Sequence, residues 1–164
     1  MWVNPDEKQG ETVKALPRLL YLINRLRWRV AKPITVGVRL ILEKDQAVFL
    51  VRHTYQRQWY LPGGGVEKGE TLEEAARREA AEEFGASLGR LRLCGVYTSF
   101  YEQKSDHVVV FSCDEFTLTG ETGSEIESFR FFGFDDLPEE TSPGSLRRIE
   151  EYVSQDGLPV VGVW

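Results

Sequence analysis

The segment from Gly63 to Gly85 constrains the fold of this chain more than any other part of its 164 residues. Three consecutive glycines open the segment and predict a bend, and Thr71 with Glu74 then forms a T-x-x-E capping box that starts a helix. The helix is predicted to last until about Phe84, because Gly85 is placed to end it. The rest of the fold must therefore accommodate a glycine bend joined to a capped helix.

Runs rich in β-branched and aliphatic residues surround this segment and predict strands. Ile34 to Leu42 and Gln46 to Val51 are separated by three polar residues, which suggests a hairpin. A last helix is predicted to begin near Ser142 and Pro143. The later strand candidates are Arg90 to Tyr101, His107 to Phe116 and Glu127 to Phe134. Strands mixed with helices, without an internal repeat, indicate one layered α/β domain over residues 33–164.

Residues 1–32 form a separate N-terminal region, with a polar tail followed by a predicted amphipathic helix from Pro17 to about Ala31. At 100° per residue its apolar side holds Leu16, Leu19, Leu20, Ile23, Leu26 and Val30, and its basic side holds Arg18, Arg25, Arg29 and Lys32. Arg27 lies amid the apolar side, which fits a specific ion pair better than lipid. The helix could cap the domain's own core, form a homodimer contact or anchor at a membrane surface, and packing on protein is favoured.

Composition argues against several classes of protein. The net charge of −6 lacks the basic character expected of a nucleic-acid binder. The two cysteines, Cys94 and Cys113, have no metal-binding spacing and lie in apolar runs, so both are predicted to be reduced core residues. No run of eighteen apolar residues or signal peptide is evident, and a cytoplasmic protein is expected.

Three glutamates within the predicted helix indicate a metal site. Glu79, Glu82 and Glu83 stand at positions i, i+3 and i+4, so their carboxylates share one side of a single turn. Like charges this close repel one another, and a hard divalent cation such as Mg²⁺ offsets that repulsion. An acidic, solvent-facing helix is the alternative, because charge runs usually face water.

The spacing of residues around these glutamates resembles the signature of a known family. Gly64 to Ala86 fits every fixed position of the Nudix box, G-x5-E-x7-R-E-U-x-E-E-x-G-U, where U is a bulky or aliphatic residue. The two U positions hold alanine, which is smaller than the usual choice. The likeness extends over about Pro33 to Pro138, and includes Trp59 to Pro62 before the glycines and Glu125 with Ile126 later in the chain. The sequence is therefore identified as similar to the Nudix hydrolases.

The resemblance implies an α/β/α sandwich around a mixed β-sheet, to which the N-terminal helix would be an addition. By position, Glu79, Glu82 and Glu83 would bind Mg²⁺, or Mn²⁺ in its place, and the backbone carbonyl of Gly64 often joins such sites. Glu70 and Arg78 match positions where a carboxylate and a guanidinium brace the loop against the helix.

The implied activity is Mg²⁺-dependent hydrolysis of a phosphoanhydride bond in a small nucleotide: a nucleoside diphosphate linked to another moiety, as in a nucleotide sugar or ADP-ribose, or a nucleoside triphosphate. Glu82 and Glu83 belong to the predicted catalytic set, and Glu83 and Glu125 are the candidates for the base that activates water. Trp59, Tyr97 and Tyr101 are candidates for stacking on a base, although such aromatic residues are more often core. A binding module that senses a nucleotide without cleaving it is the competing hypothesis.

Overall fold

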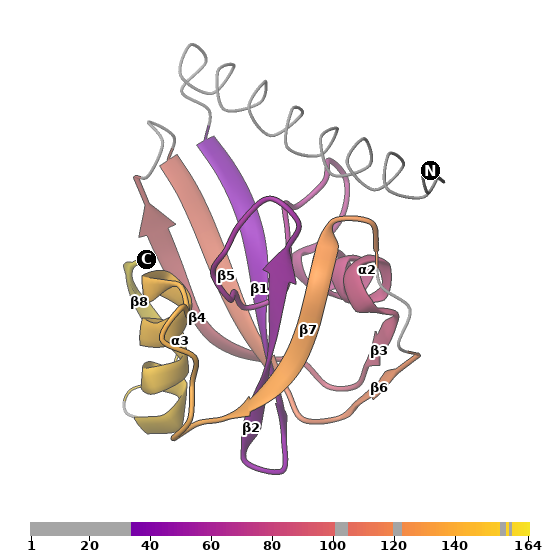
Figure 1. Cartoon of the computed structure of the whole chain (residues 1–164). Coiled ribbons are helices and arrows are strands. Elements are labelled where there is room, and N and C mark those ends of the chain that lie inside the picture. The colour runs from indigo at the N-terminus through magenta and orange to yellow at the C-terminus, as the bar shows by residue number, and fades with distance from the viewer. Residues whose placement is uncertain (1–33, 101–104, 120–122, 155–156, 158) are drawn as a thin grey trace, which may run out of the picture.

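The computed structural model describes residues 34–100, 105–119, 123–154, 157 and 159–164. The predicted N-terminal helix and Tyr101 lie outside these residues. Within them, six strands form one mixed sheet in the order β7-β2-β1-β5-β4-β8 (Figure 1). The strands are β1 (Ile34–Lys44), β2 (Ala47–His53), β4 (Arg92–Ser99), β5 (Ser105–Cys113), β7 (Ile126–Gly133) and β8 (Val160–Val163). The β1–β5 and β4–β8 pairs are parallel, and the other three pairs are antiparallel.

The predicted hairpin is confirmed as β1 and β2. Lys44 pairs with Ala47, so Asp45 and Gln46 alone form the turn, with φ angles of 51° and 59°. Two positive φ values in a two-residue loop match the right-handed twist of the strands that the loop joins. This hairpin puts β1 at the centre of the sheet, next to β5, where it can support the glycine bend.

Two helices cover opposite faces of the sheet, which confirms the sandwich. Helix α2 (Leu72–Phe84) contributes to one core cluster together with Val38, Leu40 and Phe49. The rings of Phe49 and Phe84 lie 4.8 Å apart between their centroids. Helix α3 (Pro143–Ser154) contributes Ile149 to a second cluster on the other face. Figure 1 shows α2 and α3 at opposite sides of the sheet.

Three short strands were not expected from the sequence. β3 (Ala86–Leu88) and β6 (Phe116–Leu118) pair with each other in a second, two-stranded sheet, and β8 joins the edge of the main sheet. Segments of three or four residues are too short to display the alternation that identifies a strand. Their pairing is decided by the surrounding fold rather than by local pattern.

Cys94 and Cys113 are both buried and unbonded to each other, as predicted for reduced core residues. Within the described ranges, no helix has the length and apolar character needed to cross a bilayer.

Candidate active site

The glycine bend and the capped helix have the local structure that the sequence predicts. The hydroxyl of Thr71 accepts a hydrogen bond from the Glu74 amide at 3.2 Å, and the Glu74 carboxylate accepts one from the Thr71 amide at 2.7 Å. This reciprocal capping box starts α2. Gly85 ends the helix with a left-handed φ of 63°, a conformation that glycine adopts without a steric penalty. The helix bounds are therefore set by residues visible in the sequence.

Backbone hydrogen bonds hold the glycine bend against β1. The amides of Val38 and Leu40 donate to the carbonyls of Gly64 and Pro62, each at 2.9 Å. Gly63 has a φ of 124°, and a Cβ there would lie only 3.1 Å from the carbonyl carbon of Val38. A side chain at this position would strain both the backbone angle and the contact. The bend therefore lies against the central strand of the sheet because it contains glycine.

Arg78 joins the loop to the helix through Glu70. Its Nη2 lies 2.7 Å from Glu70 Oε1 and its Nε lies 3.1 Å from Oε2, which is a two-point fork. Nη2 also donates to the carbonyl of Gly65 at 2.9 Å. This pairing lowers the pKa of the Glu70 carboxyl and raises that of the guanidinium. Both groups therefore stay charged, in the bracing geometry that the resemblance implies.

The same guanidinium holds two of the predicted metal ligands. Arg78 Nη1 lies 2.8 Å from Glu79 Oε1 and 3.3 Å from Glu82 Oε2. The Glu79 side chain is 15% exposed, whereas that of Glu82 is 63% exposed. Glu79 also lies directly against the bend, because a Cβ on Gly64 would lie 2.5 Å from Glu79 Cδ. The bend and α2 therefore meet where these carboxylates are located.

Glu83 is the buried carboxyl group of the site. Its Oε2 accepts a hydrogen bond from the Gly63 amide at 3.0 Å. Burial raises the pKa of Glu83 to about 7, against the opposing effects of the Gly63 hydrogen bond and the positive charge of Arg39. The negative charges of Glu79 and Glu125 raise it further. Carboxylates from α2 and from a later turn thus act on one another at this point.

Glu125 approaches from the turn that precedes β7. The amide of Gly123 donates to the carbonyl of Glu83 at 2.9 Å, and the Glu125 carbonyl accepts from the Thr54 amide at 3.0 Å. A Cβ at Gly123 would lie 2.6 Å from the carbonyl oxygen of Glu82, so this glycine allows the turn to pack against the end of α2. The turn therefore places Glu125 near the end of α2.

Arg39 belongs to the site and was missed in the sequence. Its guanidinium donates to the carbonyls of Gly63 and Val38, and its charge acts on Glu83. The available signal was an arginine in the middle of an otherwise apolar central strand. A charged group at such a position is generally paired, because an unpaired charge is costly to bury.

The donors fit a hard divalent cation by their chemistry. Carboxylates of Glu79, Glu82 and Glu83, with the carbonyl of Gly64, are the oxygen ligands that Mg²⁺ prefers. The mutual repulsion at Glu83 is what a cation would relieve. Over the described ranges, however, no three metal-binding side chains converge closely enough for a preformed site. The Arg78 guanidinium is hydrogen-bonded to the carboxylates of Glu79 and Glu82, so an ion would have to compete with it.

Two of the aromatic residues predicted to stack on a substrate lie in the core instead. Trp59 is 7% exposed and packs edge-on against Phe132, with ring centroids 4.9 Å apart. Tyr97 is 2% exposed and donates its hydroxyl to Glu151 at 2.7 Å. The guanidinium of Arg148 covers the Tyr97 ring at 3.9 Å. Both rings are therefore closed to a substrate base in this structure, in agreement with the alternative that such aromatic residues belong to the core.

A mixed sheet between two helices, with a glycine bend held against an acidic helix by a Glu70–Arg78 fork, defines a sandwich protein of the Nudix type. Comparison with known families agrees, because the family model described as "NUDIX domain" matches residues 31–152. The chain therefore belongs to the Nudix hydrolase family.

Several relatives are similar over much of their length. An "ADP-ribose pyrophosphatase" of Methanocaldococcus jannaschii is 34% identical over 117 residues, which cover 68% of this chain and 69% of the relative. A "Putative 8-oxo-dGTP diphosphatase" of Bacillus subtilis is 31% identical over 117 residues, which cover 69% and 75% of the two chains. The solved structure of a MutT Nudix hydrolase from Burkholderia pseudomallei is 25% identical, covers 71% of this chain and 96% of its own, and has a TM-score of 0.65.

Proposed function

We propose that this chain uses a divalent cation, Mg²⁺ or Mn²⁺, to hydrolyse a phosphoanhydride bond in a small nucleotide. The proposed substrate is a nucleoside diphosphate linked to another moiety, or a nucleoside triphosphate. Relatives named as a pyrophosphatase and as a diphosphatase support this class of reaction. Their names differ in the nucleotide, so the class of bond is supported better than the identity of the substrate.

The observation that carries the proposal is the buried carboxyl group of Glu83, which accepts a hydrogen bond from the glycine bend at 3.0 Å and is acted on by the charges of Glu79 and Glu125. The three residues come from α2 and from the turn before β7, yet their charges act on one another. A surface helix that merely faces water would leave its carboxylates solvated and apart. Like charges that act on one another in a partly buried position are destabilising, and such arrangements are concentrated at functional sites.

Glu79, Glu82 and Glu83 would hold the cation, with the Gly64 carbonyl beside them. When bound, the ion polarises phosphoryl oxygens and offsets the negative charge that develops as the anhydride breaks. The fork of Arg78 on Glu70 holds the loop against α2, which keeps the glycine bend next to the helix that carries the three glutamates.

A proton must leave the attacking water, and Glu83 and Glu125 are the two candidate bases. Glu83 is anchored by the Gly63 amide at 3.0 Å, which fixes one carboxylate oxygen and leaves the other for a ligand or a proton. Glu125 lies on a different segment, in the turn that packs against the end of α2, and its charge acts on Glu83. Comparing Glu83→Gln with Glu125→Gln at saturating metal separates the two roles, since loss of the base lowers kcat and loss of a ligand weakens metal binding.

The test is a turnover assay on the purified full chain, stripped of metal and then supplied with Mg²⁺ or Mn²⁺. The panel should contain ADP-ribose, a nucleotide sugar, a dinucleotide and an oxidised nucleoside triphosphate, with products separated by chromatography. We expect metal-dependent cleavage of at least one compound, and a loss on the order of 100-fold in Glu83→Gln. Glu150→Gln, an exposed glutamate on α3, is the matched control and should retain full turnover.

The outcomes also separate catalysis from nucleotide sensing. A sensor would bind a member of the panel, measured by calorimetry, without cleaving it at any metal concentration. Unchanged turnover in both Glu82→Gln and Glu83→Gln, with folding intact by circular dichroism, would remove these residues from the active site.

A further inference from the structure

Half of one sheet face has no helix over it among the described residues. Helix α2 lies against β1 and β7, and the same face continues across β5, β4 and β8 beyond it. Figure 1 shows α2 beside β7 and the β4–β8 edge at the far side of the sheet. Helix α3 covers the opposite face, since Ile149 packs with the second core cluster.

The uncovered half of this face is apolar. Val109 belongs to the α2-side core, and the register places Val96 beside it and Val161 beside Val96. Leu93 pairs with Phe111 on the same face. Leu93 and Val161 are open on this face, 46% and 87% exposed, whereas Val109 and Phe111 are buried. A sheet face of this composition is normally covered, because apolar side chains gain about 25 cal/mol for each Å² removed from water.

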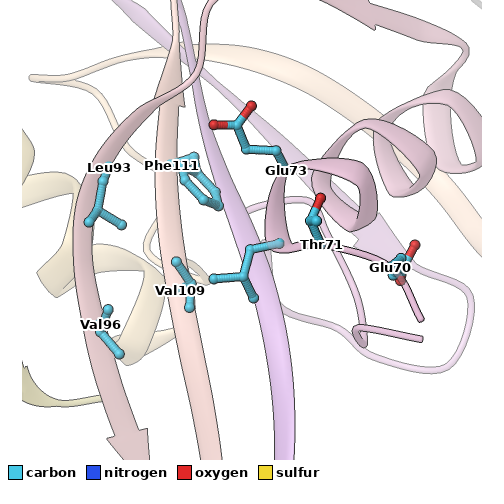
Figure 2. A pocket seen from close by; sticks show the side chains of 8 residues that line it. Glu70, Thr71, Glu73, Leu93, Val96, Val109 and Phe111 are labelled. Carbon is cyan, nitrogen blue, oxygen red and sulfur yellow. The ribbon is translucent and has the colours of Figure 1, made fainter. Parts of the chain in front are cut away.

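A cavity of about 720 Å³ lies where this face meets the start of α2. Figure 2 shows Leu93, Val96, Val109 and Phe111 directed into it from β4 and β5. Its other wall is the first turn of α2 and the residues before it, Glu70 to Glu73. The result is a groove with an apolar floor and an acidic rim.

We propose that the predicted N-terminal helix, Pro17 to about Ala31, docks with its apolar side in this groove. Fifteen helical residues span about 22 Å, and the eight residues of β4 span about 26 Å, so the helix matches the length of the floor. Only Lys32 and Pro33 separate it from Ile34, which begins β1 next to β5. Ile34 is 76% exposed and lies four residues before Val38, which pairs with Val109 of the groove floor, so the same face of β1 leads from the groove to the point where the chain enters the fold.

Charge complementarity supports this occupant. Arg27 lies amid the apolar side of the predicted helix, where a cation needs a partner carboxylate. Glu73 is the exposed carboxylate of the rim, and it lies in the first turn of α2. Glu70, the other rim carboxylate, is already paired with Arg78. Docking would therefore bring Arg27 to Glu73 while Arg18, Arg25 and Arg29 face solvent.

The test compares two single-cysteine variants of the full chain for their rate of reaction with a maleimide, in lipid-free buffer. Leu93→Cys reports on the groove, and Val153→Cys on α3 is the matched control, because the two positions are 46% and 51% exposed. The parent chain, in which Cys94 and Cys113 are buried, supplies the background. We expect Leu93→Cys to react about tenfold or more slowly than Val153→Cys, because a covered thiol reacts only on local opening.

A second set of variants identifies the cover. Adding Leu20→Asp and Ile23→Asp to the Leu93→Cys chain should bring its maleimide rate up to the control rate. Adding Arg27→Glu should also raise that rate, with Glu73→Arg restoring the protection. Equal rates for Leu93→Cys and Val153→Cys in the otherwise unchanged chain would overturn the proposal. So would protection that disappears on dilution, because a second copy would then be the cover. If the aspartate variant fails to fold, the comparison within the unchanged chain still decides.

Discussion

The guanidinium of Arg78 contacts both oxygens of Glu70, at 2.7 Å and 3.1 Å, across the eight positions that separate the two residues in sequence. This fork connects the loop before α2 to the middle of the helix. The remaining nitrogen of Arg78 contacts Glu79 at 2.8 Å and Glu82 at 3.3 Å. One residue therefore orders the loop and two of the candidate ligands together.

Arg78→Lys is expected to lower activity 10- to 100-fold, the usual effect of losing a residue that orients metal ligands. A lysine keeps the charge but cannot make the two-point contact with Glu70. Glu70→Gln should produce part of the same loss, and the double variant should be no worse than Arg78→Lys alone. Steady-state kinetics on the parent, the two single variants and the double variant measures this coupling. If the two losses of activity simply add, Glu70 and Arg78 do not act as a pair.

Gly64→Ala should impair activity more than folding. The added Cβ would lie 2.5 Å from Glu79 Cδ, so the flexible carboxylate must move away while the backbone stays in place. We expect a loss of turnover of at least about tenfold, because misplaced catalytic groups cost far more in rate than in stability. Gly65→Ala is the matched control, since nothing lies within 4 Å of its Cβ. Similar kinetics in the two variants would contradict the role assigned to Gly64.

Local signals explain why the loop and α2 could be predicted from sequence. A capping box and a helix-ending glycine act within a few residues, so their effect does not depend on the rest of the chain. The hairpin was visible for the same reason, because a short polar break between apolar runs determines its own turn. The Glu70–Arg78 fork followed from family spacing.

Contacts distant in sequence could not be predicted in this way. Tyr97 lies in a predicted strand and Trp59 just before the glycine bend, but only the tertiary structure shows that Phe132 packs on Trp59 and that α3 packs on Tyr97. Arg39 was overlooked because its partner carbonyl, on Gly63, is 24 residues away. Glu82 and Glu79 were predicted as ligands, yet spacing alone could not show that Arg78 holds both of them.

Thr71→Ala is expected to lower the free energy of unfolding by about 1 kcal/mol. The substitution removes the oxygen that accepts the Glu74 amide at 3.2 Å, which leaves one donor of the first turn without its cap. Thr71→Ser retains the hydroxyl and should unfold within a few tenths of a kcal/mol of the parent. Urea denaturation followed by circular dichroism measures both, and equal losses in the two variants would show that the hydroxyl is not responsible.

His53 should make the protein less stable as the pH falls from about 6.5 to 4. Burial, assisted by the charge of Arg39, lowers the pKa of His53 from 6.5 to about 4, and its Nδ1 has no hydrogen-bond partner among the described residues. Between these values the unfolded chain binds a proton that the folded chain does not, so the free energy of unfolding decreases toward acid by up to about 3 kcal/mol. The contribution is fully retained above pH 6.5.

The pH dependence of unfolding in His53→Gln isolates this contribution from the other acidic transitions of the chain. Glutamine is uncharged throughout, so the variant should lose less stability than the parent between pH 6.5 and 4.5, whatever constant offset the substitution introduces. Urea denaturation of the parent and of His53→Gln at several pH values gives both curves. A His53→Gln curve parallel to that of the parent would mean that His53 takes up its proton equally well in the folded and unfolded chain.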